Sequence, residues 1–387
     1  MNELSARIAT NTTDIDNFLA AQSLPTPSFD PNAPLIPFHP TIARFGLANL
    51  VPLDGETTFA ELAVAAGLGE SHVRKLVRHA ITQHIFREPR PDVVAYSATS
   101  RLLAEDADVA AWVRWRNDDF WLAAYHACEA IARWPGSGEP NETGFSLASR
   151  SSLGMFDILA SEPERAARFA AGMRLYASRL DLDVHYLVDA WPWGELQEGA
   201  TVIDVGGSHG EAAIALARTY PSFKFIVQDI DARTIQEADS RKPADVADRV
   251  RYMTHDFFIE QSIRKADVYL YRACLPNWSD KYAVRILRAL IPSLKVGARV
   301  LLNDVVVPGP EEMSLGEASE VRSGDLSMMI LFNAGDREVS DWARLFELAS
   351  PGFEFKGAKR PPGSELWILE ALWNGVDTAG QEYTITV

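Results

Sequence analysis

A glycine-rich turn, DVGGSHG, lies between a β-branched run and a helical pattern and contains Gly206, Gly207 and Gly210. Glycine permits a sharp turn and lets a ligand come close to the backbone. Asp229 ends the next β-branched run, nineteen residues after Gly210. From that position a carboxylate can bind the two hydroxyls of a ribose. The spacing therefore predicts a site for a ligand that contains a nucleoside.

Asp204 narrows the choice of that ligand. It comes directly before the glycine turn, and Ser208 occupies the place of the second glycine in the GxGxxG pattern of nicotinamide cofactors. A carboxylate at this place would repel a pyrophosphate and attract a positive amino group. We therefore expect S-adenosylmethionine rather than NAD as the cofactor. No spacing in the chain indicates a metal site.

The elements that must position these residues alternate in character after Gly199. Apolar runs at TVIDV, KFIVQD, RYMTHD, DVYLYR and RVLLNDVVV are separated by helical patterns such as EAAIALAR and SDKYAVRILRAL. This alternation predicts right-handed crossovers and a parallel sheet covered by helices. Two further runs, at 353–359 and 365–373, are close enough to form an antiparallel hairpin at its edge. The expected fold class is α/β, with a doubly wound, Rossmann-like, seven-stranded sheet.

The first part of the chain is mainly helical. The proline-rich segment 24–40 separates an N-terminal helix from the rest of the chain, and Thr57–Ser97 shows the order helix, turn, helix, hairpin. Thr58 and Glu61 form the pattern of a capping box at the start of the first of these helices. This order predicts a winged helix. Helical, aromatic-rich sequence begins at Arg101 and is interrupted by WPGSGEPNETGF.

The charge balance argues against a nucleic-acid partner. The second helix of the predicted winged helix carries Arg74, Lys75 and Arg78, which suit either DNA or a solvated helix face. However, the 387 residues contain 37 Lys and Arg against 53 Asp and Glu, a net charge of −16, which disfavours polyanions and anionic membranes. Cys128 and Cys274 are too few for a disulfide framework, and no apolar stretch is long enough to span a bilayer. We expect a cytoplasmic protein without nucleic-acid or membrane partners.

The run from Thr201 to Pro308 resembles the plant and fungal S-adenosylmethionine-dependent O-methyltransferases. The winged helix and the segments WPGSGEPNETGF and FNAGDREVSDW extend this resemblance over nearly the whole chain. It implies a homodimer formed by a helical, winged-helix dimerisation domain at residues 1–150, followed by a cofactor domain at 151–387. The expected cofactor residues, from the methionine part through ribose and adenine to the pocket wall, are Asp204, Gly206, Gly207, Gly210, Asp229, Asp256, Phe257, Arg272 and Trp278.

The proton acceptor of that family is missing here. Family members use a histidine within a Leu-His-Asp-Trp segment, and the equivalent segment LPNW has Pro276 in its place. Proline cannot accept a proton, so general-base catalysis worth roughly 10² to 10⁴ in rate is absent from its usual position. Asp304 and Asp336 match the supporting carboxylates of the family. The histidines considered as replacements are His126, His209 and His255.

A cofactor site without this base is similar to the fungal methyltransferase-like pericyclases of the leporin cyclase type. That resemblance implies a protein that binds S-adenosylmethionine without consuming it and orients a polyene for a cyclisation. It assigns functional positions to Glu142, Asn303 and Asp304, with Asp336 as a further acid. The first two differ from the histidine and the arginine that the leporin enzyme has there. Apolar residues expected to shape the pocket, or alternatively the core, are Phe145, Met155, Phe156, Met328, Met329 and Phe332.

The preferred hypothesis is therefore a pericyclase that acts on a polyketide-type small molecule in fungal secondary metabolism. Orientation and a fixed positive charge can lower the barrier of such a reaction without a proton acceptor. The main alternative is an O-methyltransferase with a displaced base. A catalytically silent partner that binds S-adenosylmethionine is the third. These three hypotheses predict different products from the same incubation.

Overall fold

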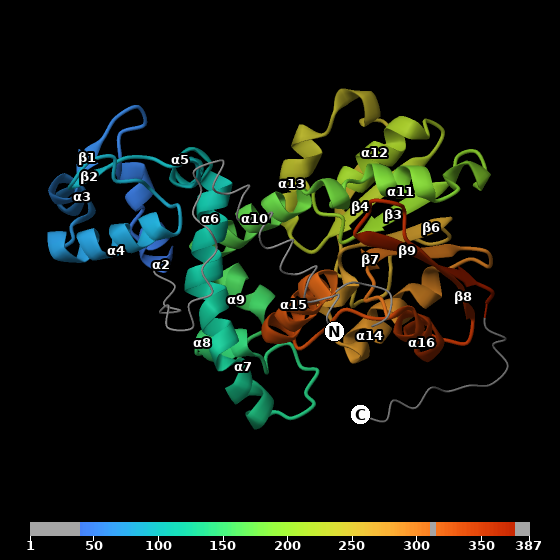
Figure 1. The fold of residues 1–387 in the computed structure, drawn as a ribbon. Helices are drawn as coiled ribbons and strands as arrows, with labels where there is room; N and C mark the ends of the chain where they lie inside the picture. Colours follow the sequence, from blue (N-terminus) through green and yellow to red (C-terminus); the bar gives the residue numbers. More distant parts are fainter. Residues whose placement is uncertain (1–38, 310–314, 376–387) are drawn as a thin grey trace, which may run out of the picture. The chain divides into compact units, whose positions relative to one another are not determined.

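A mostly parallel sheet of seven strands forms the C-terminal part of the computed structural model, which describes residues 39–309 and 315–375 (Figure 1). Its strand order is β5-β4-β3-β6-β7-β9-β8, in which β9 runs antiparallel to both β7 and β8 and the other pairs are parallel. The strands are β3 (Thr201–Val205), β4 (Lys224–Asp229), β5 (Val250–Thr254), β6 (Val268–Arg272), β7 (Arg299–Val305), β8 (Phe353–Lys359) and β9 (Leu366–Trp373). The predicted α/β sheet and its edge hairpin are confirmed.

Helices cover both faces of this sheet because alternate apolar residues of its buried strands point to opposite sides. One face packs against α11 (His185–Ala190) and α12 (Glu211–Thr219). The other face packs against α14 (Asp280–Leu290) and α16 (Val339–Ala349). The order 5-4-3-6-7 reverses direction between β3 and β6, so the loops after these two strands lie beside the crevice where such sheets bind ligands.

The sheet region also contains α13 (Ala232–Arg241), between β4 and β5.

The residues before the sheet are mainly helical, as predicted. The helices outside the sheet region are α2 (His39–Arg44), α3 (Phe59–Ala66), α4 (Glu70–Thr82), α5 (Ala98–Glu105), α6 (Ala107–Trp115), α7 (Trp121–Arg133), α8 (Gly144–Ala148), α9 (Met155–Ser161), α10 (Pro163–Ala177) and α15 (Leu315–Phe332). Of the proline-rich segment 24–40, all but the last two residues lie outside the described residues.

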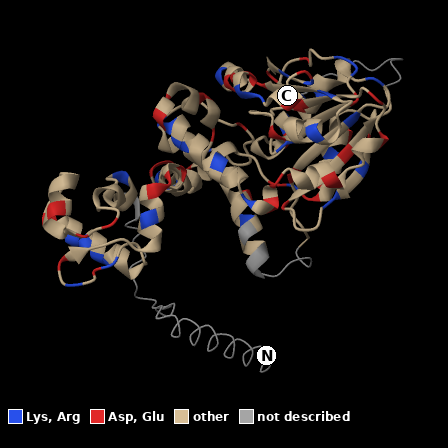
Figure 2. Ribbon diagram, turned by 90° about the horizontal axis from the view of Figure 1, so that it is seen from above, with Lys and Arg blue, Asp and Glu red and all other residues tan. Residues whose placement is uncertain are grey.

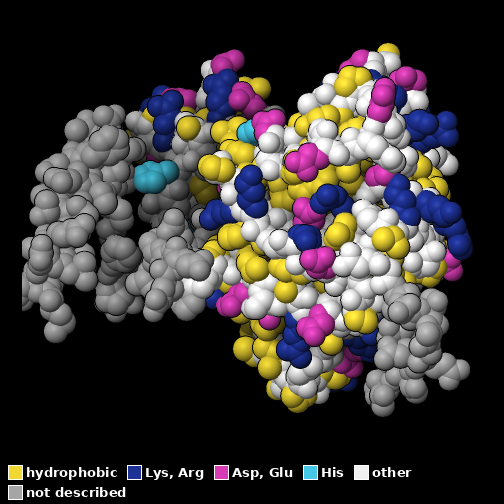
Figure 3. Space-filling view, turned by 90° about the vertical axis from the view of Figure 1, so that its right-hand side faces the viewer, with side chains coloured by type: hydrophobic (Ala, Val, Ile, Leu, Met, Phe, Trp, Pro, Cys, Tyr) yellow, Lys and Arg dark blue, Asp and Glu magenta, His cyan; other side chains and the backbone are white. Residues whose placement is uncertain are grey.

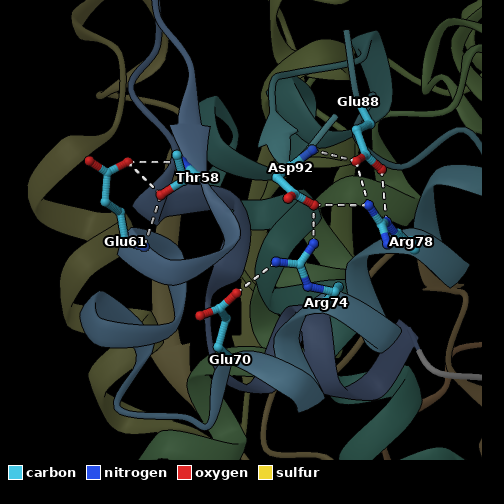
Figure 4. Close-up of polar contacts among 7 residues, drawn as sticks. All are labelled: Thr58, Glu61, Glu70, Arg74, Arg78, Glu88 and Asp92. Carbon is cyan, nitrogen blue, oxygen red and sulfur yellow. Dashed lines mark hydrogen bonds and ion pairs between the residues drawn. The ribbon is translucent and has the colours of Figure 1, made fainter. Parts of the chain in front are cut away.

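The segment predicted as a winged helix contains both helices and a small sheet. The capping box is present, because the Thr58 hydroxyl accepts from the Glu61 amide and the Glu61 carboxylate accepts from the Thr58 amide (Figure 4). The expected hairpin partner differs. The hairpin is expected between the apolar runs at 85–86 and 93–96. Strand β2 (Val93–Val94) instead pairs with β1 (Thr57–Thr58), and next to the first run there is only a bridge between Arg87 and Ala95. Pro89 and Pro91 lack the N–H groups that a longer hairpin needs.

The arginines on α4 bind acidic residues of their own domain rather than standing free. Arg74 pairs with Glu70 and Asp92, and Arg78 pairs with Glu88 and Asp92 (Figure 4). These contacts raise the pKa of both guanidinium groups. Intramolecular pairing of this kind lowers the positive charge that α4 offers to a polyanion. Figure 2 shows basic and acidic residues interspersed over the ribbon, and Figure 3 shows both kinds interspersed on the side of the molecule that it draws.

The helices before and after residue 150 share one hydrophobic core. Trp115 and Phe145 pack in it together with Met155 and Phe332. The division at residue 150 into two domains stays a prediction, because this shared core gives no separation there. In the described ranges, 39–309 and 315–375, no helix is both long enough and apolar enough to cross a membrane.

Candidate cofactor and acceptor site

The glycine turn is built so that side chains would not fit. Gly206 and Gly210 have φ angles of 73° and 78°, in the left-handed region that favours glycine. A Cβ atom on Gly206 would lie 2.6 Å from the Cys274 sulfur, and one on Gly210 would lie 2.7 Å from the Tyr252 hydroxyl. The Gly206 amide also donates to the Gln228 carbonyl at 2.8 Å, which holds the turn against β4. The predicted close approach of backbone to ligand is therefore available here.

Asp204 lies directly beneath this turn. It is 1% exposed, and neither of its carboxylate oxygens accepts a hydrogen bond of normal geometry from the described residues. A Cβ atom on Gly207 would lie 2.5 Å from its carboxyl carbon. Burial raises the pKa of Asp204 to about 7, against the opposing charge of Arg272. A buried carboxylate without a partner calls for a positive group or a donor from outside the protein, and the amino group of S-adenosylmethionine fits this need.

The ribose and adenine candidates lie around the same turn. The Ser208 amide donates to Asp229 Oδ2 and the Asp231 amide donates to Asp229 Oδ1, both at 3.1 Å. These bonds fix the Asp229 carboxylate at the end of β4. A Cβ atom on Gly206 would lie 3.7 Å from the Phe257 ring. The structure thus brings the predicted ribose and adenine residues to the turn, while Asp256 accepts from the Phe258 amide at 2.8 Å.

Trp278 joins the cofactor side to the expected acceptor side. Its ring packs edge-on against Phe258, with centroids 4.6 Å apart, and against Phe257 at 5.9 Å. On the other side it contacts Phe156 at 6.1 Å, and Phe156 stacks on Phe332 at 5.2 Å. These aromatic rings form a continuous wall suited to a flat, apolar acceptor.

Arg272 and Asn303 bind each other rather than a ligand. Arg272 Nη1 donates to Asn303 Oδ1, and Arg272 Nη2 donates to the Leu182 carbonyl. The Asn303 amide nitrogen donates to the Trp367 carbonyl at 2.9 Å, and this residue is 2% exposed. The expectation that Asn303 orients a substrate is therefore corrected, because its side chain already bridges β6 and β9. Arg272 is half-buried, and burial lowers its pKa.

Asp304 and Asp336 form a pair of interacting carboxylates. Asp304 is fully buried on β7, and its two carboxylate oxygens accept no hydrogen bond of normal geometry within the described part of the chain. Burial raises its pKa to about 7, and the charge of Asp336 adds to this rise. Burial likewise raises the pKa of the less buried Asp336 to about 6, together with the charge of Asp325. Both groups therefore change charge close to neutral pH.

The segment with Pro276 lies next to this pair. It forms a short 3-10 helix, Leu275–Asn277, after β6, and the Leu275 amide faces the Asp304 carboxylate and opposes the rise of its pKa. The Ala273 amide donates to the Asn303 carbonyl at 3.1 Å, which ties the start of this segment to β7. Pro276 itself is buried. Pro276, at the position of the family base, therefore follows a residue whose amide faces the Asp304 carboxylate, and burial raises the pKa of that carboxylate to about 7.

Arg337 is a site residue that sequence reasoning missed. Its buried guanidinium donates to Asp280 and to the backbone carbonyls of Leu275 and Trp278. The only signal in the sequence is its place directly after Asp336, in NAGDRE, and a charged residue before a helix is usually a surface residue.

Two of the three histidines considered as replacement bases make other side-chain contacts, and the third is buried. His209 is exposed beside the Ser208 hydroxyl, at 3.1 Å. His126 pairs with Glu129 on α7, at 3.1 Å. His255 is 7% exposed, and burial lowers its pKa. Across residues 39–309 and 315–375, no hydrogen bond or ion pair connects any of them to Asp304 or Asp336.

The expected pocket residues divide into two groups. Phe145 and Met155 are 0% and 1% exposed, so their side chains belong to the core and the prediction that they line a pocket is corrected. Phe156 is 42% exposed and belongs to the aromatic wall. The partly buried Met328 and Met329, with Phe332, lie on α15. Glu142 binds the Ser137 hydroxyl at 2.5 Å, and its catalytic role stays a prediction.

Comparison with known proteins identifies the family. Residues 139–354 match the O-methyltransferase domain. The chain is 36% identical to O-methyltransferase pyvH of Aspergillus violaceofuscus, over 96% of this chain and 98% of that protein. It is 38% identical to chlorophenol O-methyltransferase of Trichoderma longibrachiatum, over 86% of this chain and 72% of that protein. The chain therefore belongs to the fungal O-methyltransferase family and has S-adenosylmethionine as its cofactor.

The fold is also shared with an enzyme of different chemistry. A solved structure described as a pericyclic reaction enzyme has a TM-score of 0.72 and 21% identity, and the match covers 96% of this chain and all of that one. At this identity the similarity shows the fold alone. The comparisons consequently support the O-methyltransferase alternative better than the preferred pericyclase hypothesis.

Among the described residues, no group of three or more metal-binding side chains is present.

Proposed function

We propose that the protein transfers a methyl group to a phenolic hydroxyl of a small aromatic molecule, with Asp336 as the proton acceptor and Asp304 as its partner. The observation that carries this proposal is the buried Asp304 carboxylate beside the segment that lacks the family histidine, together with the half-buried Asp336, whose charge acts on Asp304. When bound, S-adenosylmethionine supplies the methyl group. Asp204, Asp229 and the glycine turn would hold it at the ends of β3 and β4.

A carboxylate whose pKa lies near neutral is a better base than an ordinary one. At pH 7 to 8 Asp336, with a pKa of about 6, is mostly ionised and still binds a proton more strongly than a solvent-exposed aspartate. Asp304 is fully buried whereas Asp336 is half-buried, so Asp336 is the member that an acceptor can reach. Each proton taken from the acceptor hydroxyl would move to this carboxylate.

This base selects an acidic hydroxyl. A phenol has a pKa of about 10, as in tyrosine, whereas a hydroxyl as weakly acidic as water has a value of about 15.7. A carboxylate of pKa about 6 can assist the first much more effectively than the second. The exposed ring of Phe156, which contacts the partly buried Trp278, also favours a flat ring.

A pericyclase is the second candidate, and Pro276 favours it. A cyclisation that needs orientation but no proton acceptor would be indifferent to the missing histidine. The aromatic wall could hold a polyene of polyketide type as well as a phenol. This candidate gains no support from the relatives of higher identity, which are named O-methyltransferases.

One incubation separates the candidates. Purified protein is mixed with S-adenosylmethionine and, in separate reactions, with substituted phenols, aliphatic alcohols and conjugated polyenes, and products are measured by mass spectrometry. We expect S-adenosylhomocysteine in equal amount to a product that is heavier by one methylene unit, from the phenols only. An isomeric product from a polyene with the cofactor intact would support the pericyclase and contradict our proposal.

We also propose a homodimer that works in fungal secondary metabolism in the cytoplasm. Support for the dimer comes from large apolar side chains exposed on α7, namely Trp121, Leu122, Tyr125 and Ile131, which are 49% to 77% exposed. Exposed apolar patches are typical of protein interfaces. Light scattering coupled to size exclusion should give about twice the mass of 42.8 kDa, and a Tyr125→Glu variant should shift it toward the monomer.

A further inference from the structure

Arg337 directly follows Asp336 and lies where several segments of the acceptor site meet. Its side chain is 5% exposed. Its Nε donates to the Asp280 carboxylate at 2.9 Å, its Nη1 to the Leu275 carbonyl at 3.3 Å and its Nη2 to the Trp278 carbonyl at 2.6 Å. The two carbonyls lie at either end of LPNW, so one side chain holds both ends of the segment in which proline replaces the histidine.

The backbone of Arg337 is fixed to the strand that carries Asp304. The Val307 amide donates to the Arg337 carbonyl at 2.9 Å, and Val306 pairs with Arg337 in a parallel bridge. The guanidinium carbon lies 5.0 Å from the ring centroid of the fully buried Trp342. Arg337 therefore connects the segments that follow β6 and β7. Its neighbour Asp336 is held from the other side, because the Asp336 amide donates to Asp325 Oδ1 at 2.9 Å.

We propose that Arg337 is the positioning residue of the acceptor site, which fixes the LPNW segment against Asp304 and Asp336 and supplies a positive charge that faces both carboxylates. This inference rests on the proposed function for its activity readout. Proline has no N–H, so the backbone donor that a histidine would have at position 276 is missing. The carbonyls at the two ends of the segment are the groups by which Arg337 fixes it.

The charges around the pair come from several elements. Five described groups act on Asp304 or Asp336 or lie within reach of Asp304: Arg272 at the end of β6, Cys274 after β6, Asp325 on α15, Arg337 before α16 and Glu365 before β9. Burial raises the pKa of both carboxyl groups, and Asp325 and Glu365 raise that of Asp336 further. Arg337 lowers the pKa of both members, whereas Arg272 acts on Asp304. Loss of the Arg337 charge should therefore raise both values.

The test compares Arg337→Met, Arg337→Lys and the control Arg288→Met. Arg288 also donates to two backbone carbonyls, those of Leu348 and Ala349 at the end of α16. Unlike Arg337, it is not among the charges that shift the pKa of Asp304 or Asp336, so it is a suitable control. Two properties are measured for each variant in the presence of S-adenosylmethionine. One is the pH dependence of kcat/KM with a phenol that the protein methylates, and the other is the titration of the aspartate carboxyl carbons by ¹³C NMR, assigned with Asp304→Asn and Asp336→Asn.

We expect Arg337→Met to move the acid limb of the pH profile and both NMR titrations upward by about one pH unit. Arg337→Lys keeps the charge, so its titrations should stay within about 0.3 unit of the wild type, while kcat/KM falls about tenfold because an ammonium cannot hold both carbonyls and Asp280 at once. Arg288→Met should change neither the limb nor the titrations. All three should bind S-adenosylmethionine as tightly as the wild type.

The inference is overturned if Arg337→Met and Arg337→Lys leave both the pH limb and kcat/KM unchanged. It is also overturned if Arg288→Met moves the limb as far as Arg337→Met does. Should Arg337→Met fail to fold, an unchanged kcat/KM in Arg337→Lys decides against it. If no phenol is methylated by the wild type, the proposed function fails, and the NMR titrations alone then decide whether Arg337 lowers the pKa of the pair.

Discussion

Asp204 and Asp304 are two buried carboxylates with the same local character and different surroundings. Each lies near the carboxyl end of a central parallel strand, each lacks a hydrogen-bond partner of normal geometry within the described residues, and burial raises the pKa of each to about 7. Asp204 lies beneath a glycine turn that a ligand can approach, whereas Asp304 lies beside a second carboxylate, Asp336. Burial alone therefore does not assign a role to a carboxylate. Asp204 is placed to bind a positive group of the cofactor, whereas Asp304 and Asp336 are placed to exchange a proton with the acceptor.

The largest expected effect separates these two aspartates by cofactor affinity. Asp204→Asn should weaken binding of S-adenosylmethionine by roughly 10³-fold, because removing one partner of a buried charge pair costs about 3–5 kcal/mol. Asp304→Asn is the matched control, with the same change on an equally buried strand residue, and its affinity should stay within about threefold of the wild type. Isothermal titration calorimetry measures both. Equal losses in the two variants would end the comparison and place Asp304 in the cofactor site.

The second prediction concerns the acceptor region. Asp336→Asn should lower kcat/KM for a phenol by about 10²-fold, at the lower end of what general-base catalysis supplies, while the affinity for S-adenosylmethionine stays the same. In the wild type kcat/KM should rise from pH 5 to pH 8, since the base acts in its ionised form and burial has raised the pKa values of the pair to about 6 and about 7. The limb belongs to the pair rather than to either residue. A flat profile from pH 5 to 8 would contradict the role of the carboxylates.

The two regions also differ in how far the sequence alone could describe them. The cofactor region is local: the glycine turn, Asp229 and the strand-ending acids follow from spacing, and the structure brings them together. Strand β8 begins and ends at the predicted residues, although its pairing with β9 shifts register between Phe355 and Gly357. The position of Asp204 before the glycine turn could also be predicted from the sequence, because the strand that contains it runs directly into that turn.

The acceptor region depends on contacts between distant segments, which spacing does not show. Asn303 is bonded to Arg272 and Trp367, 31 and 64 residues away, and so is not free for a substrate. Phe145 and Met155 fit a pocket and a core equally well by their types, and only the packing of α8 and α9 against other helices makes them core residues. Arg337 could not be predicted for the same reason, since its carbonyl partners lie about 60 residues earlier in the chain.

The third prediction restores the missing base. Pro276→His should raise kcat/KM for a phenol about tenfold, because an imidazole beside the carboxylate pair is a stronger and better-oriented acceptor than Asp336 alone. Asn277→His is the control, since it adds the same ring one residue along the 3-10 helix. A pericyclase would respond to neither change. If Pro276→His leaves both methyl transfer and cyclisation unaltered while the protein stays folded, the position beside Asp304 is not where the acceptor binds.

The smallest expected effect is on stability, and it again distinguishes the two aspartates. In each, the folded-state pKa of about 7 lies above the ordinary value of 3.8, so the folded protein binds more protons than the unfolded chain between about pH 4 and pH 7. Without the cofactor the free energy of unfolding should therefore fall as the pH rises through this range and level off above it.

A positive amino group that binds Asp204 would lower the pKa of this carboxylate in the complex. The increase in Tm caused by S-adenosylmethionine should then be larger at pH 7.5 than at pH 5, by about 1 °C for each kcal/mol of added stability in a chain of this length. Differential scanning fluorimetry at the two pH values should show this gain in the wild type and in Asp304→Asn but not in Asp204→Asn. A gain of equal size in Asp204→Asn would mean that another group meets the charge of the cofactor.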